Sequence, residues 1–285
     1  MTEPRTHSAW APGPAWLFCP ADRPERYPKA LAAADVVILD LEDAVAPGHR
    51  HAARAALHGL AADGSLDTTR TIVRVNAAGS PDHALDLTAL QDSGITRLML
   101  AKTENAAHVT SLPFEVIALL ETPLGIERAG EIAFADNVIA VMWGAEDLTA
   151  GLGGTSSRNA EGRYRDVSRY ARSRALIAAK AAGRLAIDAV HLDISDTAGL
   201  ADECADAMAS GFDATAAIHP TQAPVIRAAY APLAAQLDWA RRLLDHVGDE
   251  QGVLTFEGAM VDGPVYAAAR RVLARAAANP SQESR

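Results

Sequence analysis

Eight short apolar runs dominate this sequence, and each of them leads into polar or charged residues. The runs lie at residues 16–19, 36–39, 71–73, 98–101, 116–120, 138–143, 185–187 and 214–218, and helix-like stretches rich in Ala and Leu separate them. Strands that alternate with helices imply a parallel sheet, and polar groups at the carboxyl ends of eight buried strands are typical of the working face of a (β/α)8 barrel. We therefore predict an α/β fold of the TIM-barrel class that carries an active site.

The length of 285 residues suits one barrel with an addition, since a barrel takes about 250 residues. We expect a loose N-terminal arm at 1–14, a catalytic barrel at 15–232 and a C-terminal helical extension at 233–285. Within the extension we expect helices at 236–247 and from about 265 to 277, with a turn at 248–252 between them. The expected barrel helices are 26–34, 49–62, 84–93, 125–134, 165–182, 198–210 and 223–229.

Charge and cysteine usage exclude several classes of partner. The formal net charge of -10 argues against general binding to nucleic acid or anionic membranes, because both require clustered cations. No apolar stretch approaches the ~20 residues that span a bilayer. Cys19 and Cys204 show neither paired nor metal-ligand spacing, which indicates reduced thiols. We expect a cytoplasmic protein without nucleic-acid or membrane partners.

Two carboxylates, Glu121 and Asp147, follow the fifth and sixth runs and should project into the same barrel mouth. Two carboxylate oxygens, completed by water and substrate oxygens, suit Mg2+. Spacing alone slightly favours the alternative, in which such carboxylates cap a following helix or pair with an arginine. The glycine-rich loop at 151–157 lacks the following lysine of a phosphate-binding loop, so it is weak evidence for nucleotide binding.

Arg74 lies inside the third apolar run, where an arginine is costly unless it is paired. Its planar guanidinium suits a substrate carboxylate or carbonyl oxygen, and the alternative is a structural ion pair with Asp40, Glu42 or Asp43. We expect at least one of these three acids to orient Arg74 or a metal-bound water. We expect Lys102 to be electrostatic or structural, because nearby carboxylates favour its charged form over a Schiff-base role.

Basic residues at positions 23, 26 and 29 surround the start of the first expected helix and suit phosphate groups. A solvated helix face explains them equally well. His219 ends the last run; it suits a substrate contact, although simple termination of the strand is slightly favoured.

Several motifs in order along the chain identify a family. The chain resembles the citrate lyase beta-subunit-like proteins of the HpcH/HpaI aldolase superfamily, and especially citramalyl-CoA lyases, from about residue 15 to 275. The matching segments are 17–22 (LFCPAD), 37–45 (VILDLEDAV), 74–76 (RVN), 121–122 (ET), 144–147 (GAED), 186–188 (AID), 218–220 (IHP) and 260–262 (MVD).

This resemblance implies a Mg2+-dependent carbon–carbon lyase acting on a CoA thioester of a 3-hydroxy dicarboxylic acid. It implies that Glu121 and Asp147 hold the metal and that Arg74 binds the oxo-acid portion. Asp262 would be the catalytic acid/base, delivered by the tail of a neighbouring subunit in a homotrimer or dimer of trimers. The CoA and substrate contacts that the resemblance implies are Phe18, Lys29, Ile187 and Asp188.

Two positions depart from the family pattern, namely Glu25, where relatives carry a basic residue, and Ala101, where they often carry proline. The first bears on CoA affinity, and Arg23 or Arg26 would substitute. Three other activities stay open at this stage: hydrolysis of malyl-CoA, a citrate lyase beta subunit acting on an acyl-carrier thioester, and CoA-thioester binding with little turnover. The sequence does not distinguish pyruvate from glyoxylate as the released acid.

Overall fold

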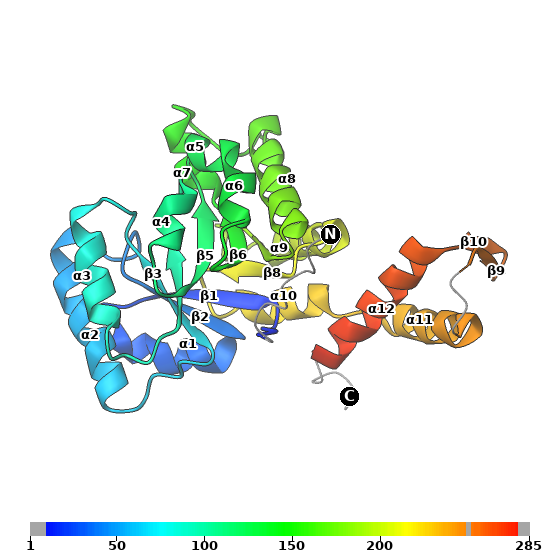
Figure 1. Ribbon diagram of the computed structural model, residues 1–285, viewed down its shortest axis with the longest axis horizontal. Helices are drawn as coiled ribbons and strands as arrows, with labels where there is room; N and C mark the ends of the chain where they lie inside the picture. Colours follow the sequence, from blue (N-terminus) through cyan, green and yellow to red (C-terminus); the bar gives the residue numbers. More distant parts are fainter. Residues whose placement is uncertain (1–9, 249–251, 279–285) are drawn as a thin grey trace. The chain divides into compact units, whose positions relative to one another are not determined.

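The computed structural model describes residues 10–248 and 252–278, and its larger unit is a closed barrel of eight parallel strands (Figure 1). The strands pair in chain order, and β8 closes the ring by pairing with β1. The predicted TIM barrel is confirmed. The strands are β1 (Ala15–Pro20), β2 (Val36–Asp40), β3 (Thr71–Val75), β4 (Arg97–Leu100), β5 (Glu115–Leu120), β6 (Val138–Trp143), β7 (Leu185–Asp188) and β8 (Ala214–Ala217).

Helices connect successive strands. They are α1 (Tyr27–Ala33), α2 (Arg50–Ala62), α3 (Pro81–Leu90), α4 (Ala106–Thr110), α5 (Pro123–Glu127), α6 (Ala129–Ala133), α7 (Ala145–Gly151), α8 (Asp166–Ala181), α9 (Thr197–Ser210) and α10 (Gln222–Tyr230), with short 3-10 turns η1 (Pro24–Arg26) and η2 (Pro47–His49).

Two predicted helices differ from the structure. The single helix expected at 125–134 is two helices, α5 and α6, because Arg128 between them leaves the helical dihedral region (φ −92°, ψ 11°). Helix α3 begins three residues before its expected start because Pro81 occupies its first turn, where a missing N–H costs nothing. Neither difference alters the order of strands.

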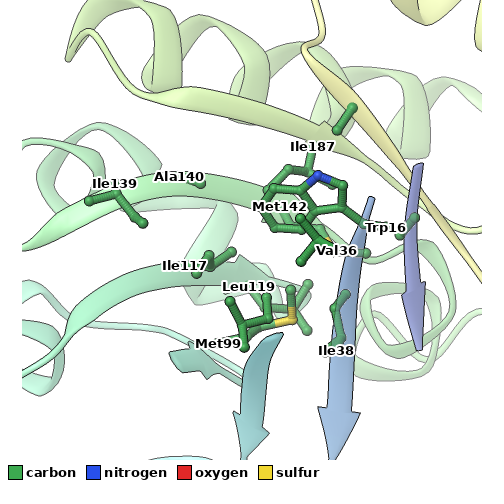
Figure 2. Packing of buried hydrophobic residues seen from close by; sticks show 13 residues of the cluster. Trp16, Val36, Ile38, Met99, Ile117, Leu119, Ile139, Ala140, Met142 and Ile187 are labelled. Carbon is green, nitrogen blue, oxygen red and sulfur yellow. The ribbon is translucent and has the colours of Figure 1, made fainter. Parts of the chain in front are cut away.

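The barrel interior is packed with aliphatic and aromatic side chains (Figure 2). Successive side chains of a strand point to opposite faces, so alternate residues of each strand fill the interior. This inner cluster comprises Trp16, Val36, Ile38, Ile72, Met99, Ile117, Leu119, Ile139, Ala140, Met142, Ile187, Ala214 and Ala216.

By internal contacts the chain divides into residues 1–226 and 227–285. The second unit holds α11 (Ala234–Val247), strands β9 (Leu254–Phe256) and β10 (Ala259–Val261), and α12 (Gly263–Ala278). The two strands form an antiparallel hairpin whose turn residues, Glu257 and Gly258, both have positive φ, as a tight two-residue hairpin turn requires. Val261 and Tyr266 pack against Leu243 in a separate core.

No helix among the described residues has the length and hydrophobicity needed to cross a membrane. Cys19 and Cys204 are buried free thiols. Of the expected N-terminal arm, residues 1–9 lie outside the described part of the chain, and Trp10 packs on Trp16 with ring centroids 5.4 Å apart.

Candidate active site

The inward-facing rows of three strands continue into polar residues at the carboxyl end of the barrel. Asp40, Arg74 and Glu121 each stand two positions after a residue of the inner cluster, so strand alternation directs their side chains inward. All three are buried, with exposed fractions of 0%, 8% and 3%. Buried charged groups persist only when they are paired or bind an ion.

A cavity of about 260 Å³ lies at this end of the barrel and brings together five of the predicted site residues, Phe18, Asp43, Arg74, Glu121 and Asp147. Its polar wall contains Arg74, Glu121 and Asp147, the three residues expected to hold substrate and metal. Its complete lining is Phe18, Asp43, Arg74, Leu119, Glu121, Met142, Trp143, Gly144, Ala145, Glu146, Asp147, Ala189, Val190 and Leu192.

Glu121 and Asp147 form an oxygen-rich corner of this cavity. Glu121 follows β5, and Asp147 lies in the first turn of α7. Burial raises the pKa of Glu121 to about 8, and the Asp147 carboxylate adds to the shift, while Arg74 opposes it. A bound cation would relieve this cost of ionisation. Among the described residues no group of three or more His, Cys, Asp or Glu side chains gathers as a metal cluster, so a cation here would keep water or substrate oxygens, as Mg2+ does.

The guanidinium of Arg74 is fixed by a bidentate pair with Asp40. Its Nε lies 2.7 Å from Asp40 Oδ1 and its Nη2 lies 2.6 Å from Asp40 Oδ2. The guanidinium also stacks over Phe18, with its carbon 4.8 Å from the ring centroid. Burial opposes the charge, but Asp40 outweighs it and raises the pKa of Arg74, which therefore stays cationic. Arg74 is both a buried ion pair and a wall of the cavity.

Lys102 links the carboxylates that surround the mouth. Its Nζ donates to Glu42 Oε1 at 2.5 Å and to Asp43 Oδ2 at 3.3 Å, and lies 3.7 Å from Asp147 Oδ1. Burial alone would lower the pKa of Lys102, but its hydrogen bond to Glu42 and the charges of nearby carboxylates raise it. A raised pKa favours the charged ammonium form, whereas the nucleophile of a Schiff base is the neutral amine.

A second cavity of about 410 Å³ shares Phe18 with the first. Arg26 and Lys29 give it a basic wall, and His219 lies at its rim with Nδ1 2.8 Å from Thr221 Oγ1. The full lining is Leu17, Phe18, Cys19, Pro20, Arg26, Lys29, Ala30, Ile218, His219 and Pro220. Cationic side chains beside an apolar wall suit an anionic ligand with an extended apolar part.

Ile187 and Asp188 point in opposite directions at the end of β7. Ile187 belongs to the inner cluster, whereas Asp188 faces outward. Its Oδ1 accepts from Trp143 Nε1 at 2.6 Å, and its Oδ2 accepts from Arg172 Nη2 at 2.7 Å. Neither residue lines the 260 Å³ cavity or the 410 Å³ cavity. Their contact with CoA or substrate therefore stays a prediction.

Asp262 belongs to the second unit, where it joins β10 to α12. Its backbone carbonyl accepts from Tyr266 N at 3.0 Å, and its side chain is half-buried. Its predicted catalytic role stays a prediction.

Sequence reasoning missed the apolar side of the first cavity and the importance of Gly144. A Cβ at Gly144 would lie 2.9 Å from Glu121 Oε2, so only glycine lets that strand end approach the carboxylate. Met142 and Trp143 end β6. The alternation of side chains along a strand predicts that Met142 points inward and Trp143 outward. The distance between Gly144 and Glu121 could not be predicted from the sequence.

Comparison with known proteins places this geometry in a family. Residues 15–220 match the model of the HpcH/HpaI aldolase/citrate lyase family. A citrate lyase subunit beta-like protein of Mycobacterium tuberculosis is 57% identical over 267 residues, covering 93% of this chain and 96% of that protein. The human mitochondrial citramalyl-CoA lyase is 29% identical, covering 94% of this chain and 86% of that protein.

A crystal structure of the M. tuberculosis protein CitE in complex with magnesium, acetoacetate and coenzyme A is similar throughout. It superposes with a TM-score of 0.88 at 57% identity, and the match covers 94% of this chain and 99% of that chain.

Proposed function

Since the chain belongs to the HpcH/HpaI aldolase/citrate lyase family, we propose that it is a Mg2+-dependent carbon–carbon lyase that cleaves a 3-hydroxy-dicarboxylyl-CoA thioester. The substrate would be of the citramalyl-CoA or malyl-CoA type, and the products a 2-oxo acid and an acyl-CoA. The meeting of Glu121, Asp147 and Arg74 in one cavity carries the proposal. The relative whose crystal structure contains magnesium, acetoacetate and CoA supports it, as does the citramalyl-CoA lyase among the relatives.

Glu121 and Asp147 would hold Mg2+, which when bound supplies a Lewis acid and a template for the carboxylate and hydroxyl oxygens of the substrate. Arg74 would bind the oxo-acid portion and stabilise the negative charge that develops there. Because Asp40 already fixes the guanidinium, this positive charge is oriented before the substrate arrives.

The second cavity would receive part of the CoA moiety. Lys29 and Arg26 supply positive charge for phosphate groups, and the apolar wall suits the pantetheine arm. Phe18 lines both cavities, so a thioester could extend from one into the other past its ring. Glu25 does not prevent this assignment, because Arg26 lies beside it on the cavity wall.

In the proposed reaction the substrate hydroxyl passes its proton to solvent water at the cavity mouth and becomes the carbonyl of the 2-oxo acid. The adjacent carbon–carbon bond breaks, and its electron pair passes to the thioester fragment as an enolate. Asp262, in its acid form, then donates a proton to the enolate carbon and releases acyl-CoA. In the condensation direction the Asp262 carboxylate removes the same proton.

The reaction is tested most cheaply in the condensation direction. The protein is incubated with Mg2+, either acetyl-CoA or propionyl-CoA, and either pyruvate or glyoxylate, and the thioester products are identified by mass. One hydroxy-dicarboxylyl-CoA product, absent when EDTA is present, supports the proposal and names the oxo acid. Release of free CoA and malate from added malyl-CoA, without release of glyoxylate, would instead indicate a thioesterase.

Asp262 would act on the barrel of a neighbouring subunit in a homotrimer or dimer of trimers, and complementation tests this arrangement. Glu121→Ala and Asp262→Asn should each be inactive alone. When the two variants are co-expressed and purified as mixed oligomers, about a quarter of sites combine an intact barrel with an intact tail if the two come from different subunits. Mixed oligomers without activity would show that each tail serves its own barrel or that Asp262 has another role.

A further inference from the structure

Lys102 adopts a backbone conformation that lysine rarely takes. It follows β4 with φ of +49°, and the other non-glycine residues with positive φ in the described chain are Asp92 and Glu257. The left-handed region costs an L-residue about 1–2 kcal/mol, and a lysine side chain cannot offset this by bonding to its own backbone. Surrounding structure must therefore hold the residue there.

Hydrogen bonds on both sides of Lys102 fix it in place. The Ala101 N–H donates to Val75 O on β3 at 3.2 Å, and the Thr103 N–H donates to Leu119 O on β5 at 3.0 Å. Ala101 and Thr103 are fully buried. A strained residue persists where its neighbours determine its geometry in this way, and such residues cluster at functional sites.

The strained turn aims the backbone of Lys102 at the metal corner. Its N–H donates to Glu121 Oε1 at 2.9 Å, while its ammonium group contacts Glu42 and Asp43 and lies 3.7 Å from Asp147 Oδ1. Glu121 is 3% exposed, so this N–H replaces a hydrogen bond that solvent would otherwise donate to its carboxylate. Because Ala101 and Thr103 are both held by hydrogen bonds, a residue at position 102 with negative φ would fit only if the peptide planes beside it rotated. That rotation would turn the N–H of residue 102 away from Glu121.

We infer that Lys102 is a positioning residue for the metal site, in which the left-handed backbone, rather than the ammonium group, orients the Glu121 carboxylate for the cation. The inference rests on the proposed function, because it takes Glu121 to be a metal ligand. It separates the backbone contact of Lys102 with Glu121 from the contacts of its ammonium group with Glu42, Asp43 and Asp147.

Two substitutions that both remove the ammonium group separate backbone from side chain. Asparagine accepts the left-handed region readily, whereas β-branched valine resists it. We expect Lys102→Val to bind Mn2+ about tenfold more weakly than Lys102→Asn, as the loss of an outer-shell hydrogen bond typically causes. Free Mn2+ is measured by electron paramagnetic resonance. Lys102→Gly, which eases the turn further, should bind as well as Lys102→Asn.

The exposed residue Asp92, with φ of +61°, provides the matched control. Asp92→Val carries the same backbone conflict away from the cavity lining, so it should lower the thermal midpoint but leave Mn2+ affinity equal to that of Asp92→Asn. Equal Mn2+ affinity of Lys102→Val and Lys102→Asn, with the wild type binding Mn2+ and Glu121→Gln failing to bind, would overturn the inference alone. Failure of the wild type to bind Mn2+ would overturn the proposed metal site itself.

Discussion

Replacing Gly144 by alanine should weaken metal binding without unfolding the barrel. Gly144 has extended backbone dihedral angles (φ −125°, ψ 126°), which any residue adopts, so the substitution introduces no backbone strain. Its effect is steric, because the new Cβ would lie 2.9 Å from both Cβ and Oε2 of Glu121.

The required displacement follows from these distances. Ordinary van der Waals contact begins at 3.4 Å, so the Glu121 side chain must move by about 0.5 Å. Metal–ligand distances tolerate about 0.2 Å. We therefore expect Mg2+ affinity to fall about 10- to 100-fold, as it does when the support of a ligand is lost, which corresponds to about 1.4–2.7 kcal/mol. Overpacking should also lower the free energy of unfolding by about 1–3 kcal/mol.

Calorimetric titration with Mg2+ measures the affinity, and urea denaturation measures the stability. Gly59→Ala is the matched control, since a Cβ at Gly59 on helix α2 would meet no atom within 4 Å. Wild-type Mg2+ affinity in Gly144→Ala would refute the reasoning, whether or not stability changes, because it would show that the position of Glu121 does not limit binding.

Three further results are expected. In the metal-free protein the pKa of Glu121 is raised to about 8, so below pH 8 a cation must displace a proton. Mg2+ affinity should therefore rise about tenfold per pH unit from pH 6 towards 8. A calorimetric affinity that does not change with pH would contradict this. Asp40→Asn should lower the free energy of unfolding, measured by urea denaturation, by about 3–5 kcal/mol, because it leaves buried Arg74 without its charged partner. The exposed control Asp166→Asn should change this free energy by less than about 0.5 kcal/mol. Burial raises the pKa of Cys19 to about 11 and that of Cys204 to about 12. A thiol reagent at pH 8 should therefore modify neither thiol in the folded protein and both thiols in urea. Rapid modification of either thiol in the folded protein would contradict this.

Much of the barrel could be predicted because buried parallel strands are continuous apolar runs, and all eight runs are strands. The inward direction of Asp40, Arg74 and Glu121 was equally readable, since alternation within a strand continues to its end. The same rule sends Asp188 outward to Arg172, which the family motif by itself conceals. Alternation was thus a better guide to side-chain direction than motif membership.

Features that depend on distances between separate segments could not be predicted. The contact of Gly144 with Glu121 and the left-handed turn at Lys102 each require the packing of neighbouring strands. The break at Arg128 is a change in two dihedral angles at a residue type that itself favours helices. Sequence patterns report which faces are buried, but not how closely two faces approach.

We propose that Glu121 at the end of β5 makes the barrel a metal-dependent carbon–carbon lyase. The most direct test follows cleavage of citramalyl-CoA and malyl-CoA by the wild type and by Glu121→Gln, with Mg2+ and with EDTA, and measures the released 2-oxo acid. We predict that one thioester is cleaved to acyl-CoA and its 2-oxo acid by the wild type with Mg2+, and that EDTA or the substitution abolishes cleavage. Equal cleavage in the presence of EDTA, or by Glu121→Gln, would contradict the account.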